Sequence, residues 1–153
     1  MADQTLTLSL DSGGDVVIQL RPDLAPNHVE QITTLAKQGF YDGVVFHRVI
    51  EGFMAQTGCP EGTGRGGSGK KLKAEFSKEK HTRGTVSAAR AMDPNSADSQ
   101  FFICFEDAPW LDGQYSVWGK VTEGMENVDQ IKRGEPVQDP DRMVSVKVAA
   151  DAA

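Results

Sequence analysis

The feature of the chain that most constrains its fold is a series of short strand-like runs with helical periodicity at only two places. Each run is rich in apolar and β-branched residues and is bounded by turn residues; the runs lie at 5–10, 16–20, 44–50, 54–57, 85–89, 100–105, 116–121 and 143–149. Helical spacing of apolar residues is confined to 26–39 and 125–134. Many strands with few helices favour a mainly β fold, an antiparallel sheet or barrel, over alternating strand–helix units.

Both predicted helices have recognisable ends. Pro26 suits the first turn of the first helix, an apolar stripe runs from Val29 to Ala36, and Gly39 stands where a C-terminal cap belongs. The second helix is short and is expected to end at Gly134. At the start of the chain, runs 5–10 and 16–20 flank a turn-forming DSGGD segment, which predicts a β-hairpin.

Composition and charge argue against several classes of function. The 153 residues are 39% hydrophobic and show no second block of apolar periodicity, so we expect one domain over 1–153. A net charge of -6 and a pI near 5.0 argue against a phosphate-binding surface, and therefore against nucleic acid as a partner. The sequence shows no secretory leader and no apolar stretch of about 18 residues, so we expect a cytoplasmic protein with no membrane partner.

The cysteine and histidine content predicts neither a disulfide framework nor a metal site. Cys59 and Cys104 are too few for a disulfide scaffold, and the three scattered histidines do not add zinc-ligand spacing. We therefore expect reduced thiols, no metal and no cofactor.

One hairpin, at 46–58, carries a permanent charge and an amide in otherwise apolar, β-branched sequence. A three-residue turn, Glu51-Gly52-Phe53, would set Arg48 directly across from Gln56, whereas a two-residue turn would place the two side chains on opposite faces. We predict the three-residue turn. Burying an unpaired charge or amide costs several kcal/mol in rough terms, so Arg48 and Gln56 either hydrogen-bond to each other or are held ready for a ligand. An edge-strand Arg48 with its guanidinium in water is the simpler alternative.

The long segment 58–84 contains two glycine patterns that resemble nucleotide-binding loops. Residues 62–67 fit G-x-G-x-x-G, but a polar loop follows where a helix N-terminus should hold the phosphate. Residues 64–71 approach a P-loop but end in Lys71 instead of the Ser or Thr that holds magnesium. We interpret both as a surface loop and keep nucleotide binding as an alternative. Ser68 lacks nucleophile-elbow spacing and no His–acid partnership is apparent, so acyl hydrolysis is not predicted.

Taken together, several motifs in order along nearly the whole chain resemble those of the cyclophilin-type peptidyl-prolyl cis-trans isomerases. They are GFY at 39–41, FHRVI at 46–50, GFM at 52–54 with Gln56, GTG at 62–64, SQFFI at 99–103, WLDG at 110–113, GKV at 119–121 and GM at 124–125. The resemblance implies a closed eight-stranded antiparallel barrel capped by two α-helices, with a substrate groove on its outside. It also implies an enzyme that isomerises Xaa-Pro bonds in proline-containing peptides and in unfolded or flexible proteins.

The resemblance also implies the site residues. The catalytic group would be Arg48, Phe53 and Gln56, and the substrate-binding group would be Met54, Ala89, Arg90, Gln100, Phe102, Trp110, Leu111 and Tyr115. Phe53, Met54, Phe102 and Leu111 would wall a proline pocket, while the backbone of Ala89 and Arg90 would pair with the peptide and Gln100 would add hydrogen bonds. Trp110 would form the rim and makes cyclosporin a family-level ligand.

Two residues depart from the pattern. Arg90 stands where many relatives carry Asn and adds charge beside the groove, and Tyr115 replaces a common His that could titrate near neutrality. We expect a monomeric isomerase. A non-catalytic proline-peptide binding module or chaperone on the same fold is the alternative, against which an intact Arg48, Phe53 and Gln56 argue.

Overall fold

The computed structural model describes residues 4–60, 62, 67–90, 93, 95–134 and 137–150. Eight strands form one sheet: β1 Gln4–Leu10, β2 Asp15–Leu20, β3 Arg48–Ile50, β4 Met54–Thr57, β5 Thr85–Ala88, β6 Phe101–Cys104, β7 Val117–Glu123 and β8 Met143–Ala150. The helices are α1 Pro26–Lys37, the short 3-10 helix η1 Pro109–Leu111 and α2 Met125–Val128. The strand order is β3-β4-β6-β5-β7-β2-β1-β8, and each neighbouring pair is antiparallel. The predicted mainly β, antiparallel architecture is therefore confirmed.

The sheet is a curled half-barrel, so the expectation of a closed barrel is wrong. β3 and β8 are its two edges, and β3 is only three residues long. The segment before β3 meets the start of β8 through an isolated bridge between Val45 and Arg142, with Phe46 N–H donating to the Asp141 carbonyl at 2.8 Å. A continuous ladder does not form there because the chain straightens into a strand only at Arg48, later than the run 44–50 had predicted.

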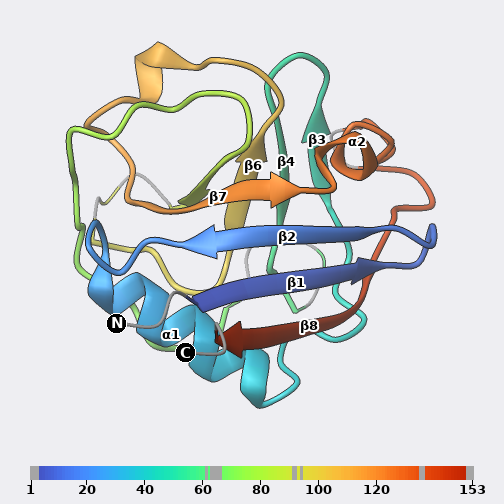
Figure 1. The fold of residues 1–153 in the computed structure, drawn as a ribbon, viewed down its shortest axis with the longest axis horizontal. Helices are drawn as coiled ribbons and strands as arrows, with labels where there is room; N and C mark the ends of the chain where they lie inside the picture. Colours follow the sequence, from blue (N-terminus) through green and yellow to red (C-terminus); the bar gives the residue numbers. More distant parts are fainter. Residues whose placement is uncertain are drawn as a thin grey trace.

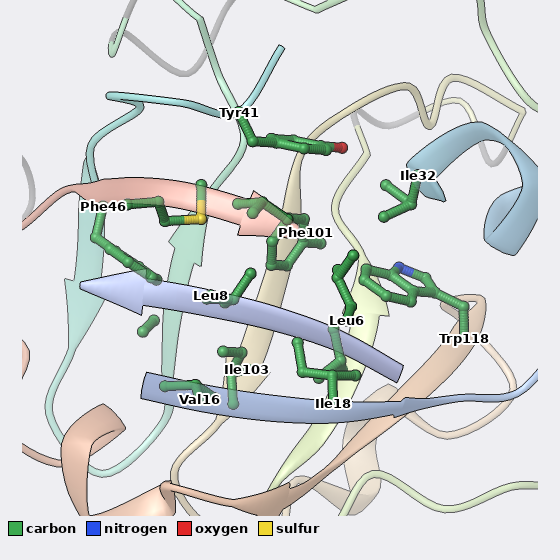
Figure 2. Close-up of a cluster of buried hydrophobic side chains, with 14 of the residues drawn as sticks. Leu6, Leu8, Val16, Ile18, Ile32, Tyr41, Phe46, Phe101, Ile103 and Trp118 are labelled. Atoms are coloured by element: carbon green, nitrogen blue, oxygen red, sulfur yellow. The ribbon is translucent and has the colours of Figure 1, made fainter. Parts of the chain in front are cut away.

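The concave face of the sheet holds the main core. In β1, Leu6 and Leu8 are fully buried while Thr5 and Thr7 are half-buried, the period-two pattern of a strand with one face inward. Figure 2 shows Leu6 and Leu8 packed with side chains from β2, β6, β7 and α1. Figure 1 shows α1 beside β8 at one end of the curled sheet and α2 at the opposite end. The core buries several large side chains completely, each of which stabilises the fold by about 1.5–3 kcal/mol.

The local sequence signals identified most elements. The N-terminal hairpin pairs as predicted, with Leu8 opposite Val16, and α1 begins at Pro26 with Gly39 beyond its end at a positive φ of 75°. α2 has only four residues, shorter than the spacing to Gly134 suggested, and η1 was not predicted. Residues 63–66 of the glycine patterns lie outside the described residues.

The start of α1 is capped from a distant loop. Its N-cap residue, Ala25, offers no side-chain acceptor. Instead, the Glu75 carboxylate accepts the backbone N–H groups of Asn27 at 3.2 Å and His28 at 2.9 Å. A carboxylate at a helix N-terminus satisfies exposed donors and complements the helix dipole. Glu75 therefore fixes the loop 67–81 to α1.

We predict that Glu75→Gln lowers the free energy of unfolding by about 1 kcal/mol, because the amide retains one acceptor and loses the charge. Urea unfolding followed by far-UV circular dichroism measures the change. Glu79→Gln is the matched control, since that exposed carboxylate lies 3.6 Å from Arg21 Nη1 and should cost less than about 0.5 kcal/mol. Equal stability losses in the two variants would contradict the capping role.

Candidate active site

The β3–β4 hairpin sets a cation beside an amide. The turn has three residues, as predicted, with Gly52 at a φ of 73°, and the register pairs Arg48 with Gln56. Arg48 Nη1 donates to Gln56 Oε1 at 3.2 Å, and Gln56 Nε2 donates in turn to Gln100 Oε1 at 2.9 Å. Gln56 therefore receives a hydrogen bond from the guanidinium on one side and is oriented by Gln100 on the other.

The same register continues across the next two strands. Gln56 pairs with Phe102 of β6, and Phe102 pairs with Ser87 of β5. Directly paired residues project from the same face of a sheet, so Arg48, Gln56 and Phe102 form a row on the convex face. Their neighbours Ala55, Ile103 and Val86 alternate to the other face and join the main core.

Above this row lies a second, smaller apolar cluster that is separate from the main core. Its buried members are Met54, Ala89, Phe102, Cys104, Ala108 and Leu111, with Ile50, Phe53 and Tyr115 packed at its edge. Burial raises the pKa of the Cys104 thiol to about 12, so it stays protonated and is a poor nucleophile. The segment around η1 covers the cluster and supplies Trp110, whose ring lies 5.6 Å from that of Phe53 while the residue is 63% exposed.

A pocket of about 350 Å³ opens over this cluster. It brings together the sequence-predicted residues Arg48, Phe53, Met54, Gln56, Ala89, Arg90, Phe102, Trp110, Leu111 and Tyr115. Gln100 does not line it and instead stands behind Gln56. Among the described lining residues two are arginines and none is acidic, so the pocket is apolar on its floor and cationic at its sides.

A polar network that the sequence analysis missed lies beneath the pocket. His81 Nε2 is 3.0 Å from Ser87 Oγ, and His81 Nδ1 is 3.1 Å from Asp112 Oδ1. The expectation of no His–acid partnership was therefore wrong. The hydrogen-bonded series Ser87–His81–Asp112 resembles the Ser-His-Asp triad of a hydrolase. Ser87 is fully buried, however, so its hydroxyl cannot reach a substrate and hydrolysis remains unsupported.

This network fastens the pocket wall. Asp112 directly follows Leu111, accepts the backbone N–H of His81 at 2.6 Å, and so ties the η1 segment to the loop before β5. The His81 ring stacks on Phe102 with centroids 6.2 Å apart. Burial lowers the pKa of His81 below 6.5, an effect that Asp112 opposes in part, while the His81 N–H lowers the pKa of Asp112. Contacts between residues this far apart in the chain leave no local sequence signal.

The described residues support neither a metal site, which the sequence did not predict, nor the alternative of nucleotide binding. Within the described ranges, no group of three or more His, Cys, Asp or Glu side chains could hold a metal ion. None of the described helices has the length and apolar character of a membrane span. In the glycine-rich loop, the N–H groups of Ser68 and Gly69 both donate at 2.9 Å to the Asp98 carboxylate. An internal carboxylate therefore occupies amides that a phosphate would need.

Comparison with known proteins gives a consistent result. The family model described as "Cyclophilin type peptidyl-prolyl cis-trans isomerase/CLD" matches residues 5–149. A probable peptidyl-prolyl cis-trans isomerase of Brucella suis is 51% identical over 97% of this chain and 84% of its own, and a peptidyl-prolyl cis-trans isomerase of Helicobacter pylori is 47% identical over 82% and 78%.

Solved structures agree with the sequence relatives. The cyclophilin AquaCyp293 of Hirschia baltica is 30% identical and superposes with a TM-score of 0.85 over 94% of this chain and 76% of its own. A Cryptosporidium parvum cyclophilin type peptidyl-prolyl cis-trans isomerase, crystallised in the presence of the dipeptide Ala-Pro, is 28% identical with a TM-score of 0.87 over 95% and 98%.

The depressed pKa of His81 predicts a pH dependence of stability. Below about pH 6.5 the unfolded chain binds a proton at this position that the folded protein resists, so the free energy of unfolding falls as the pH drops from about 7.5 towards 5. In His81→Gln this fall should be smaller. Urea unfolding at several pH values measures it. Burial also lowers the pKa of His47. Because His47 is present in both proteins, it contributes equally to the pH dependence of each. Equal slopes in both proteins would contradict the prediction.

Proposed function

The chain belongs to the cyclophilin-type peptidyl-prolyl cis-trans isomerases, and we propose that its pocket catalyses Xaa-Pro rotation without a covalent step, with Arg48 as the group that stabilises the twisted amide. The observation that carries this proposal is the row formed by Arg48, Gln56 and Phe102, which sets a cation beside an apolar floor. The substrates are proline-containing peptides and flexible proteins. The structure of the Cryptosporidium relative, determined in the presence of the dipeptide Ala-Pro, supports this substrate class.

The reaction requires an unusual kind of transition-state binding. Rotation about the bond must break amide resonance, with a barrier of roughly 18–20 kcal/mol for an ordinary peptide bond, and the uncatalysed Xaa-Pro reaction takes tens to hundreds of seconds. At the twisted geometry the proline nitrogen regains a lone pair that can accept a hydrogen bond. An enzyme therefore needs a donor aimed at that nitrogen and a dry site for the ring.

Arg48 has the properties of that donor. Its guanidinium is a cation that presents several N–H groups in one plane, so it can reach the nitrogen and a neighbouring carbonyl together. The hydrogen bond to Gln56 orients this plane. Each factor of ten in rate requires about 1.4 kcal/mol of preferential binding, within the range of one charge-assisted hydrogen bond.

The apolar floor supplies the second requirement. Phe102 and Met54 are almost completely buried, and with Phe53 and Leu111 they offer walls against which a proline ring can be held away from water. The pocket would hold the proline ring still, so that the Xaa side of the bond is the part that rotates. Ala89 and Arg90 directly follow β5. The Ala89 N–H is bonded to the Gln100 carbonyl, and the other backbone groups of these two residues would pair with the extended peptide like an added strand.

We predict that Arg48→Ala lowers kcat/KM about 10²- to 10³-fold, the usual cost of removing a preorganised donor. Two-dimensional exchange NMR on a short Xaa-Pro peptide measures the interconversion directly, and an unchanged far-UV spectrum shows that the fold persists. Arg21→Ala is the control, since that arginine pairs with Asp23 on the surface and should leave turnover unchanged. Full activity in Arg48→Ala would refute its role, while peptide binding without exchange in the wild type would favour a non-catalytic binding module.

We also predict that proline peptides and cyclosporin change the fluorescence of Trp110. Of the two tryptophans, Trp118 is fully buried in the main core and Trp110 stands exposed at the pocket rim, so a ligand in the pocket alters only the second. Titration of the wild type should give a saturable change that is lost in Trp110→Phe. A change of equal size in that variant would place the ligand elsewhere.

A further inference from the structure

The segment 129–134, which follows α2, lies against the hairpin that carries Arg48 and Phe53, and none of these described residues lines the pocket. Gly134 forms an isolated bridge with Val49, in which each N–H donates to the other residue's carbonyl at 2.8 Å. Val49 is the middle residue of β3, an edge strand of only three residues. The bridge therefore supports the free edge of the strand on which Arg48 stands.

Arg133, the residue before Gly134, holds the tip of the same hairpin. Its Nε donates to the carboxylate of Glu51, the first residue of the three-residue turn. Its Nη1 donates to the carbonyl oxygens of Asp129 at 2.8 Å and Ile131 at 2.5 Å. The side chain is thus anchored to its own segment and reaches across to the turn.

The same guanidinium also lies over the ring of Phe105, with its central carbon 4.2 Å from the ring centroid, a cation–π contact. Phe105 directly follows β6 and is buried in the main core. Its N–H donates to the Phe53 carbonyl at 2.9 Å, so it fixes the backbone of a residue that lines the pocket. Arg133 therefore acts on both ends of the turn, directly at its first residue and through Phe105 at its last.

We propose that Arg133 is a positioning residue for the isomerase reaction, because it fixes the hairpin that sets Arg48 and Phe53 around the reacting bond. This inference rests on the proposed function, since it concerns the geometry of the same pocket. A donor must point at the proline nitrogen within hydrogen-bond range, and a displacement of about 1 Å can cost about 10²-fold in rate. β3 has a neighbouring strand on one side only, so contacts from the segment 129–134 add to the precision with which Arg48 is held.

The loss of this support should slow turnover more than it weakens binding. Most of the apolar floor for the proline ring comes from Met54, Phe102 and Leu111, which stand on β4, β6 and η1, outside the turn that Arg133 holds. The alignment of Arg48 matters only when the bond is twisted. A change that affects only transition-state binding lowers kcat and leaves the affinity for the substrate nearly unchanged.

The test compares kcat with the dissociation constant of one Xaa-Pro peptide, both obtained from exchange NMR at several peptide concentrations. Arg133→Gln removes the charge and most of the planar contact with Phe105, so we expect kcat to fall about three- to tenfold while the dissociation constant changes less than about twofold. Arg133→Lys keeps a charge for Glu51 and should give an intermediate kcat. Lys132→Gln is the matched control, since Lys132 pairs with Asp139 at 3.3 Å on the surface, and it should leave kcat unchanged.

A second substitution tests the contact with the turn by itself. Glu51→Gln should lower kcat about twofold, less than Arg133→Gln does, because this ion pair is exposed and the contact with Phe105 remains. The double variant should be no slower than Arg133→Gln, since two residues that act through one contact have non-additive effects. All rates are compared at a temperature at which far-UV circular dichroism shows each variant to be folded, so that a loss of stability alone cannot lower kcat.

The possible outcomes distinguish the two proposals. If the wild type fails to accelerate the peptide, the proposed function itself is wrong and this inference falls with it. If the wild type is active and Arg133→Gln has the same kcat as Lys132→Gln, the inference about Arg133 alone is overturned and the isomerase proposal stands. A loss that appears only in the dissociation constant, or effects of Glu51→Gln and Arg133→Gln that multiply in the double variant, would also overturn the inference.

Discussion

The cross-strand register of β3, β4, β6 and β5 is the constraint on which the candidate site depends. Arg48, Gln56, Phe102 and Ser87 occupy directly paired positions, so their side chains share one face of the sheet. A slip of one residue in any pairing would send the charge or the phenylalanine into the main core. The inward-facing residues of the same strands, fully buried in the main core, hold this register. Packing on one face therefore places the chemistry on the other.

A sheet with apolar side chains on both faces must be covered twice. α1 and the curl of the sheet protect the concave face, but a segment with little regular structure protects the convex one. Because this segment forms few backbone hydrogen bonds of the kind found in a sheet, side-chain hydrogen bonds must hold it in place. His81, Asp112 and Ser87 supply them beneath the pocket. A structural hydrogen-bond network can thus resemble a catalytic triad, and burial of the Ser87 hydroxyl is what identifies this one as structural.

What could be predicted from the sequence was what depends on neighbours in the chain. Turn length fixed the pairing of Arg48 with Gln56, and a proline and a glycine marked the two ends of α1. The features that were missed, among them the Glu75 cap and the His81 network, join residues dozens of positions apart. The closed barrel was implied by resemblance alone, and the shortness of β3 prevents closure. The grouping of the site residues in one pocket was likewise implied only by the resemblance, and the cross-strand register is what produces it.

The partner of Arg48 on β4 matters as much as the arginine. A carboxylate at position 56 would form an ion pair with the guanidinium, and its desolvated attraction would compete with a weakly basic proline nitrogen. An amide gives the guanidinium a charge-assisted hydrogen bond worth about 1.5–3 kcal/mol and brings no opposite charge to it. Gln56 can therefore orient Arg48 through an acceptor that carries no charge. The hydrogen bond to an uncharged amide therefore competes less with the proline nitrogen for the guanidinium than an ion pair at this position would.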